Sequence, residues 1–280
     1  MSSASSPPDR PRRVSWRDHL DQPVEVPAVP GPQAPAFYVP IGELQGAEYR
    51  RNAFAAGTTE ELAALREIVA IGPGTRVLDV GCGDARHLRA LVAEQPGVHA
   101  VGIDVSDALV AAGRQAAATS NVEVELHTGD ARSLTAVLGD LAGTFDVVWS
   151  LCQGALGTSP LTDPDVVAGM AAAARPGGTV VMTFFHALFA ARHVAPGDAF
   201  DTLDLVHHQL AEVRGPDHAR EEFDLWTASY TAREAAALAE AAGLVVSTVR
   251  GVEPGAYGRR RDGEVALDDP EVLVVAQRPT

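Results

Sequence analysis

The sequence predicts one α/β domain in which a mostly parallel sheet is covered by helices on both faces. Short apolar segments alternate with helical segments five times, and this alternation requires right-handed crossovers between parallel strands. The chain has 280 residues and 46% hydrophobic content, which is enough to bury a sizeable core. The last two apolar segments are separated by a loop alone, so they are expected to form an antiparallel pair.

Helix starts are predicted from residues that can cap a helix. Thr58 and Glu61 have the spacing of a capping box, and so do Thr231 and Glu234. Asp163, directly before Pro164, is expected to cap a further helix. The seven strands are expected at 76–80, 98–103, 122–127, 145–150, 179–185, 244–252 and 271–277. Helices are expected to begin at Thr58, Asp84, Ser106, Ala131, Asp163 and Thr231.

Two segments are expected to lie outside this alternation. Nine of the 19 prolines fall within the first 40 residues, which predicts a flexible N-terminal arm over residues 1–36 and a folded domain over 37–280. An insertion is expected at about 187–228. Within it, alternating apolar and polar residues flank the turn at 215–217 and predict a β-hairpin between Asp201 and Trp226.

Composition argues against nucleic acid and membrane partners. Lys and Arg total 22 against 37 Asp and Glu, and the formal net charge of -15 repels nucleic acid on average. No stretch approaches the ~20 apolar residues of a membrane span, and the N-terminus lacks the apolar core of a signal peptide, which predicts a cytoplasmic protein. Cys82 and Cys152 are expected to be reduced thiols, and no metal site is predicted. The oligomeric state stays open.

The strongest motif is a hydrophobic strand that runs into a glycine-rich turn, Val77-Leu78-Asp79-Val80-Gly81-Cys82-Gly83-Asp84. Glycines suit this turn because a Cβ would obstruct both the turn and the approach of a ligand to the backbone. A dinucleotide-binding loop would require a small residue where this chain has Arg86, so NAD is the weaker interpretation.

Two carboxylates follow at the ends of the next two strands. Asp104 lies about 20 residues beyond the glycines, the separation at which an acid meets a ribose diol. Asp130 could accept a hydrogen bond from an adenine amine. Because the carboxyl ends of parallel strands share one edge of a sheet, both acids are expected to face one nucleoside.

Taken in order, the glycine loop, Asp104, Asp130, Phe145-Asp146-Val147-Val148-Trp149-Ser150 and Arg175-Pro176-Gly177-Gly178 resemble the motifs of class I S-adenosylmethionine (SAM)-dependent methyltransferases. The resemblance covers residues 76–185. It implies SAM as cofactor and a three-layer Rossmann-like methyltransferase fold. The implied sheet has seven strands in the order 3-2-1-4-5-7-6, with strand 7 antiparallel. Many members of the family carry a third glycine where this chain has Ala85.

The resemblance also implies roles for single residues. Gly81 and Gly83 would pass under the methionine part of SAM, Asp104 would hold the ribose, Asp130 the adenine, and Asp79 would position the amino group through the loop. Tyr49 could close over the sulfonium by a cation–π contact, or simply pack against a helix. The full set of expected cofactor-binding residues is Tyr49, Asp79, Gly81, Cys82, Gly83, Asp104, Val105, Asp130, Ala131, Ser150 and Leu151.

The predicted function is methyl transfer from SAM to a small-molecule acceptor. His186 is the candidate catalytic residue, because it is the first polar group after the strand at 179–185 and ligands bind at that end of an α/β sheet. Its imidazole could take a proton from the acceptor, hydrogen-bond the acceptor, or cap the following helix. Two alternatives are a methyltransferase acting on protein or RNA and a catalytically silent SAM-binding regulatory protein.

Overall fold

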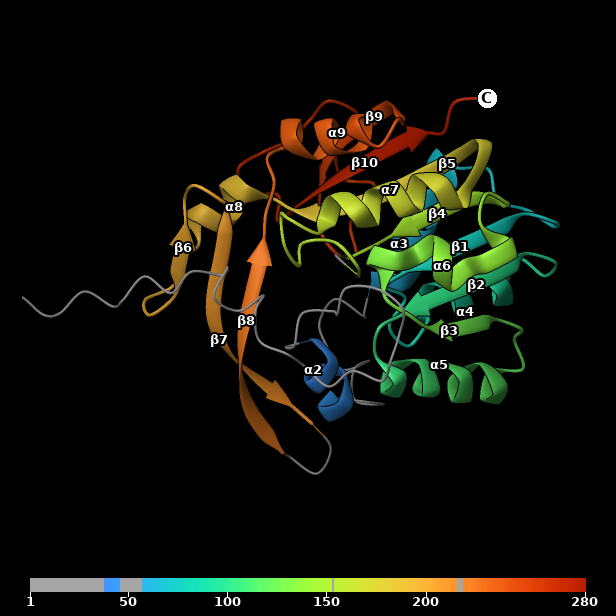
Figure 1. Cartoon of the computed structure of the whole chain (residues 1–280), viewed down its shortest axis with the longest axis horizontal. Coiled ribbons are helices and arrows are strands. Elements are labelled where there is room, and N and C mark those ends of the chain that lie inside the picture. The colour runs from blue at the N-terminus through green and yellow to red at the C-terminus, as the bar shows by residue number, and fades with distance from the viewer. Residues whose placement is uncertain (1–37, 46–56, 153, 216–218) are drawn as a thin grey trace, which may run out of the picture.

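The computed structural model describes residues 38–45, 57–152, 154–215 and 219–280 (Figure 1). The predicted arm at 1–36 and the predicted cofactor contact Tyr49 lie outside these residues.

The centre of the fold is a seven-stranded sheet with the order β3-β2-β1-β4-β5-β10-β9 (Figure 1). β10 runs antiparallel to both β5 and β9, and the pairs among β1 to β5 are parallel. When these strands are counted along the chain, the order is the predicted 3-2-1-4-5-7-6, so the predicted fold class is confirmed. The strands are β1 (Arg76–Val80), β2 (His99–Asp104), β3 (Glu125–Thr128), β4 (Phe145–Ser150), β5 (Ala174–Phe185), β9 (Val245–Val252) and β10 (Glu271–Gln277).

Helices cover both faces of the sheet and create two hydrophobic cores. α3, α4 and α5 pack on one face, and α6, α7 and α9 pack on the other. Successive residues of β1 enter opposite cores, since Leu78 belongs to one and Val77 to the other. This explains why the strands read as continuous apolar runs. The helices are α3 (Thr58–Ile68), α4 (Arg86–Glu94), α5 (Asp107–Ser120), α6 (Leu134–Leu138), α7 (Asp163–Ala173) and α9 (Ala232–Ala241).

The predicted helix caps have mixed outcomes. The capping box of Thr231 and Glu234 is confirmed at the start of α9. The capping box at Thr58 is wrong, because α3 has no side-chain cap and the carboxylate of Glu61 turns into the interior, where it meets Arg86. Pairing with a buried cation outweighs the local hydrogen bond to a helix end.

The prediction for Asp163 is also wrong in detail. Asp163 begins α7, but its carboxylate accepts hydrogen bonds from the backbone N–H groups of Gly157 and Ser159 in the preceding loop. The hydroxyl of Tyr230 donates to it as well, at 2.7 Å. The acid therefore organises the loop before the helix. The helix predicted at Ala131 begins as a short 3-10 turn, Ala131–Ser133, which leads into α6.

Between β5 and α9 the chain forms a separate three-stranded antiparallel sheet, β6-β7-β8. The predicted hairpin is confirmed, although its strands run over Val206–Arg214 (β7) and Arg220–Ala228 (β8). Trp226 and Ala228 are buried in the main core, so the base of the hairpin is part of the domain. Its far end lies beside α2 (Figure 1). The other described elements are α2 (Tyr38–Gln45), α8 (Ala187–Arg192), β6 (Ala199–Asp201) and a 3-10 turn at Gly139–Leu141.

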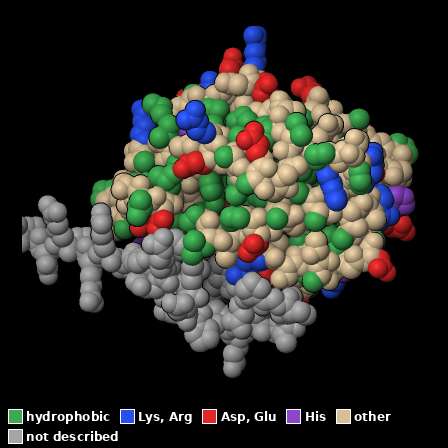
Figure 2. Space-filling view, turned by 45° about the horizontal axis from the view of Figure 1, so that its top comes forward, with side chains coloured by type: hydrophobic (Ala, Val, Ile, Leu, Met, Phe, Trp, Pro, Cys, Tyr) green, Lys and Arg blue, Asp and Glu red, His purple; other side chains and the backbone are tan. Residues whose placement is uncertain are grey.

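None of the described helices combines the length and the apolar character that crossing a bilayer requires. On the face shown in Figure 2, basic and acidic side chains lie interspersed among apolar ones. This face therefore carries a mixed charge pattern.

Candidate functional site

A cavity of about 500 Å³ lies at the carboxyl edge of the main sheet. Its volume falls within the range of roughly 300–1,000 Å³ that is typical of small-molecule sites. α2 and the β7–β8 hairpin contribute Ile41, Val213 and Leu225 to its wall. Six strands of the sheet have one end at this edge. Each of the six contributes one cavity-lining residue, located at that end or just beyond it. These residues are Gly81, Asp104, Asp130, Cys152, Phe185 and Glu271.

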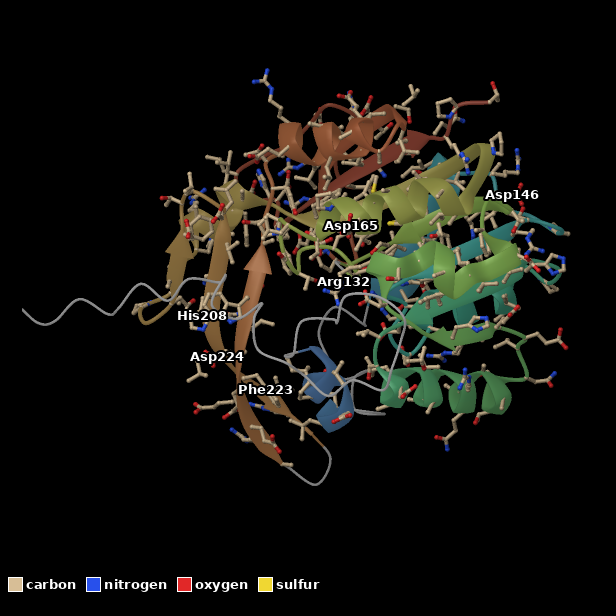
Figure 3. All side chains as sticks on the ribbon, viewed as in Figure 1. Arg132, Asp146, Asp165, His208, Phe223 and Asp224 are labelled. Carbon is tan, nitrogen blue, oxygen red and sulfur yellow. The ribbon has the colours of Figure 1, made fainter. Side chains whose placement is uncertain are left out.

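The two edges of the sheet differ in what they carry. Figure 3 shows Arg132 on the side toward the hairpin and Asp146 at the opposite end of the sheet. At that opposite edge Asp146 accepts a hydrogen bond from the backbone N–H of Arg76, and Arg175 donates to it. Asp146 is therefore structural, and the cavity lies at the edge where α/β folds bind ligands.

The glycine loop after β1 is packed directly against the loop after β4. Gly81 has a φ of +76°, and a Cβ there would lie 2.1 Å from the carbonyl carbon of Gly154. A side chain at Gly81 would therefore force the two loops apart. Ala85, at the end of the same turn, has a φ of +58°. This chain thus tolerates a left-handed residue that carries a Cβ.

Asp104 lines the cavity and is hydrogen-bonded to the glycine loop. Its Oδ2 accepts from the backbone N–H of Gly83 at 2.7 Å, and its Oδ1 accepts from the backbone N–H of Ser106 at 2.9 Å. Burial raises the pKa of Asp104, and these backbone hydrogen bonds act in the opposite direction. Each carboxylate oxygen can accept further hydrogen bonds, so both ribose hydroxyls could donate to it.

Asp130 is held by an arginine that the sequence analysis did not single out. Arg132 Nη2 lies 2.6 Å from Asp130 Oδ2, and Arg132 Nε lies 3.0 Å from each carboxylate oxygen. Both residues line the cavity, and their side chains are less than one-tenth exposed. The sequence does contain a sign of this pair, since the basic residue Arg132 follows the acid Asp130 by two positions.

The other predicted cofactor contacts fall into two groups. Val105 and Ala131 line the cavity together with Gly81, Asp104 and Asp130. Among the residues described, five predicted contacts do not line it: Asp79, Cys82, Gly83, Ser150 and Leu151. Asp79 is buried directly beneath the glycine loop, and this burial raises its pKa to about 7. Ser150 Oγ accepts from the backbone N–H of Ala155 and so shapes the loop after β4.

His186 follows β5, as predicted, but its ring is 2% exposed and is not among the described residues that line the cavity. Its Nδ1 donates to the backbone carbonyl of Asp269 at 2.9 Å, and its backbone N–H donates to the carbonyl of Pro270. These contacts link the end of β5 to the segment that precedes β10. The position favours a structural role for His186.

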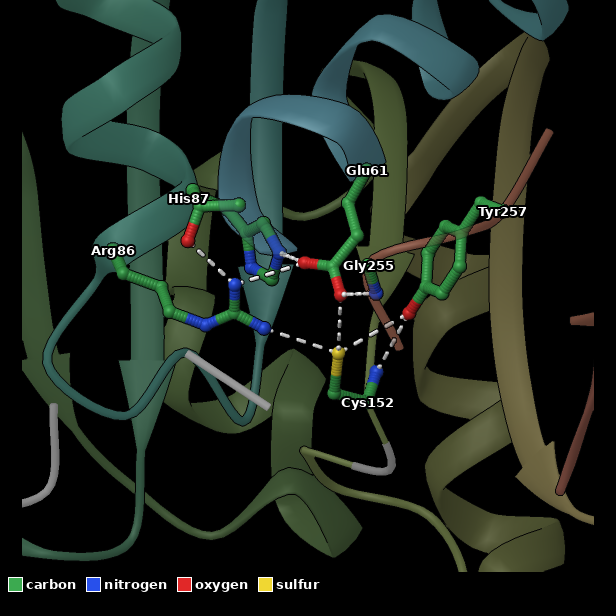
Figure 4. A network of polar contacts seen from close by, with 7 residues as sticks. Glu61, Arg86, His87, Cys152, Gly255 and Tyr257 are labelled. Carbon is green, nitrogen blue, oxygen red and sulfur yellow. Dashed lines mark hydrogen bonds and ion pairs between the residues drawn. The ribbon is translucent and has the colours of Figure 1, made fainter. Parts of the chain in front are cut away.

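Behind the glycine loop lies a buried polar network that the sequence analysis did not find (Figure 4). Glu61 Oε2 accepts from Arg86 Nη1 at 2.8 Å and is paired with His87 Nε2 at 2.7 Å. Burial alone would raise the pKa of Glu61. The hydrogen bond from His87 and the charges of His87 and Arg86 outweigh this effect and lower the pKa to about 2. Its other oxygen accepts from the backbone N–H of Gly255.

The same network reaches the cavity wall through Cys152. Its thiol lies 3.1 Å from Arg86 Nη2 and 3.2 Å from the Tyr257 hydroxyl, which also accepts from the backbone N–H of Cys152. Cys152 has a φ of +51°, which is a left-handed backbone conformation. The contacts with Arg86 and Tyr257 stabilise the residue in this conformation. Glu61, His87 and Cys152 have ligand atoms within 4.8 Å of one another, but Arg86 contacts two of the three and supplies the cation there.

The sequence and the fold were each found to be similar to those of known methyltransferases. Residues 77–178 match the family model described as a methyltransferase domain. The ubiquinone biosynthesis O-methyltransferase of Aromatoleum aromaticum is 34% identical over 119 residues, which are 42% of this chain and 47% of that protein. The match therefore spans about half the length of this curated relative.

Solved structures share the fold over most of the chain. The CcbJ methyltransferase from Streptomyces caelestis has a TM-score of 0.64 at 19% identity, covering 86% of this chain and 98% of that one. A SAM-dependent methyltransferase from Clostridium acetobutylicum has a TM-score of 0.62 at 11% identity, covering 83% and 95%. SAM-bound CalS10 from Micromonospora echinaspora, an amino pentose methyltransferase, has a TM-score of 0.51 at 24% identity, also covering 83% and 95%.

Residues 77–178 thus match a methyltransferase domain, and the sheet has the strand order that the sequence motifs predict. The chain is therefore similar to SAM-dependent methyltransferases in its fold and over the matched segment, and one of these structures contains bound SAM.

Proposed function

We propose that this protein transfers the methyl group of SAM to a small-molecule acceptor bound in the cavity at the carboxyl edge of the sheet. The observation that carries the proposal is the position of Asp104 and Asp130, which line one cavity together with Gly81 of the glycine loop. When bound, SAM supplies an electrophilic methyl group on a positively charged sulfur.

The residues present fit this cofactor. Asp104 has acceptor capacity for the ribose hydroxyls, and the Asp130–Arg132 pair lies farther along the same edge, where the adenine would bind. Gly81 leaves backbone exposed to the cavity, and Val105 and Ala131 add contacts beside the two acids. Tyr49 as a cover for the sulfonium and His186 as a base remain proposals from the sequence.

A small acceptor is supported by the enclosure of the cavity. Leu225 on β8 and Val213 on β7 line it together with Ile41 of α2, so a second layer of structure stands over the sheet edge. The names of the ubiquinone biosynthesis enzyme and of the amino pentose methyltransferase both refer to small acceptors. A protein or RNA acceptor, or a regulatory SAM-binding role, would be the alternative.

The test is calorimetry with SAM and with its demethylated product, S-adenosylhomocysteine, followed by transfer of labelled methyl groups to a panel of small acceptors. We expect micromolar binding of both ligands and transfer to at least one small molecule. No binding of either ligand would refute the proposal. Binding without transfer to any small acceptor, combined with transfer to a protein or RNA extract, would support the alternative acceptor class.

A further inference from the structure

We infer that the methyl acceptor has an apolar skeleton, and that Phe185 and Leu225 hold this skeleton between the end of β5 and the β7–β8 hairpin. The inference rests on the proposed function and extends it by naming the chemical class of the acceptor. Its first support is the place where the hairpin joins the main sheet.

The base of the hairpin lies at the end of β5. Tyr230, two residues after β8, donates its backbone N–H to the carbonyl of Phe185 and forms a bridge with His186. Gly157, in the loop after β4, packs against both partners, because a Cβ there would lie 2.9 Å from Phe185 Cδ2 and 3.1 Å from the carbonyl oxygen of Ala228. Phe185 and the base of the hairpin are therefore neighbours at one end of the cavity.

This end of the cavity is distant from the nucleoside of the cofactor. β2, which carries Asp104, is separated from β5 in the sheet by β1 and β4. With about 4.8 Å between adjacent strands, the ends of β2 and β5 are roughly 14 Å apart. The cavity therefore has a nucleoside side at Asp104 and Asp130 and an acceptor side at Phe185.

The acceptor side is lined by apolar side chains from several elements. Phe185 is the last residue of β5, and Pro270 directly precedes β10, the neighbour of β5. Leu225 of β8 and Pro254, two residues past the end of β9, line the cavity as well. Thr158 also lines it, and a hydroxyl can bind one polar substituent. Burial of an apolar skeleton among these side chains is favourable.

The apolar character continues along the inner face of the hairpin. Residues two apart in a strand lie on the same face of the sheet, so Phe223 shares a face with Leu225. Ala211 is the partner of Phe223 on β7. These three residues are partly sheltered, whereas Asp224, between Phe223 and Leu225 on β8, is exposed (Figure 3). The hairpin therefore has an apolar face that includes the cavity-lining Leu225 and an opposite face that is exposed to water.

The acids on the acceptor side already serve the protein. Asp163 accepts from the backbone N–H groups of Gly157 and Ser159 and from the Tyr230 hydroxyl. Glu271 is 2% exposed and takes part in an interaction within the protein. A charged or polyhydroxylated acceptor would lose much of its hydration here, and this loss is costly unless new hydrogen bonds replace it. An apolar skeleton has no such cost.

The experiment measures the binding of two neutral probes to protein saturated with S-adenosylhomocysteine, by calorimetry at pH 7. The probes are 4-ethylphenol, which has an apolar skeleton, and methyl β-D-xylopyranoside, a polyhydroxylated ring of similar size. We expect 4-ethylphenol to bind at least about ten-fold more tightly. Leu225→Asn places a polar group of similar size in the lining. It should weaken 4-ethylphenol binding at least about ten-fold and change the affinity for S-adenosylhomocysteine by less than about two-fold.

Two further variants keep the test decisive. Leu225→Met retains an apolar side chain of similar volume and should bind 4-ethylphenol within about three-fold of wild type. Leu210→Asn makes the polar change on the neighbouring strand, at a side chain that is 59% exposed, and should behave as wild type. The comparison of the two probes on the wild type needs no variant, and Leu225→Ala replaces the asparagine variant if that variant does not fold.

Three outcomes would overturn the inference while leaving the proposed function intact, provided that S-adenosylhomocysteine binds. These outcomes are equal or tighter binding of the xyloside, no detectable binding of 4-ethylphenol to the wild type, and 4-ethylphenol binding that is as tight in Leu225→Asn as in Leu210→Asn. Failure of S-adenosylhomocysteine to bind the wild type would refute the proposed function itself.

Discussion

Arg86 and Glu61 form a buried ion pair, with 2.8 Å between Nη1 and Oε2, directly behind the glycine loop (Figure 4). Arg86 begins α4, and Glu61 lies on α3, 25 residues earlier in the chain. The same guanidinium reaches the thiol of Cys152, which lines the cavity. The helix that precedes the sheet therefore contributes to the support of the cavity wall.

Glu61→Gln should destabilise the protein by about 3–5 kcal/mol at pH 7, because it leaves Arg86 buried without its counter-charge. Glu61 has its pKa lowered from 4.5 to about 2, so its stabilisation is present above pH 4.5 and is lost as the pH falls toward 2. The difference between variant and wild type should therefore shrink over this window. Urea unfolding at pH 7, 4.5 and 3 measures it.

The matched control is Glu60→Gln, which removes an exposed carboxylate one residue away. Its free energy of unfolding should stay within about 0.5 kcal/mol of wild type. A Glu61→Gln effect that is equally large at pH 7 and pH 3 would show that packing, and not charge, is the cause.

Asp104→Asn should weaken SAM binding by at least about ten-fold, because it removes a charge from the group expected to accept from the ribose; hydrogen bonds to charged groups contribute about 1.5–3 kcal/mol each. Calorimetry with SAM is the measurement. Asp104 also accepts from Gly83 and Ser106, so the thermal stability of the variant must be measured in parallel. Asp140→Asn, at an exposed site, serves as control. Wild-type affinity in Asp104→Asn would remove Asp104 from the cofactor site.

Leu225→Ala should raise the KM for the acceptor several-fold and leave SAM affinity nearly unchanged, because Leu225 lines the cavity from the hairpin sheet and not from the strands that lead to Gly81, Asp104 and Asp130. Leu210→Ala, on the neighbouring strand, provides the comparison, since Leu210 is 59% exposed. Steady-state kinetics with the identified acceptor would measure both. An equal effect of the two substitutions would indicate a general loosening of the hairpin. Removing the whole hairpin is a poorer test because Trp226 and Ala228 belong to the core.

His186→Ala should lower the free energy of unfolding by about 1–3 kcal/mol, because it leaves the buried carbonyl of Asp269 without the hydrogen bond from the imidazole. Turnover should remain within about three-fold of wild type, because the imidazole is buried away from the described cavity lining. The measurement pairs thermal unfolding with single-turnover methyl transfer. A fall of about 100-fold or more in turnover at unchanged SAM affinity would instead establish His186 as a general base.

The sheet and one side of the cavity could be predicted from the sequence. Crossover connections between parallel strands bring all their carboxyl ends to one edge, so the positions of Gly81, Asp104 and Asp130 after successive strands place them together. Each of these residues is recognisable from its own strand and turn. Local pattern and chain order were therefore sufficient.

The other side of the cavity depended on the tertiary structure. Glu271 reaches the edge only because β10 enters the sheet antiparallel and next to β5, and no local pattern marks its first residue as one that lines the cavity. Glu61 illustrates the same limit, since its spacing from Thr58 fits a capping box. Its carboxylate instead pairs with Arg86 and His87, because a charge that becomes buried on folding is stabilised most by buried partners that only the folded chain brings near it.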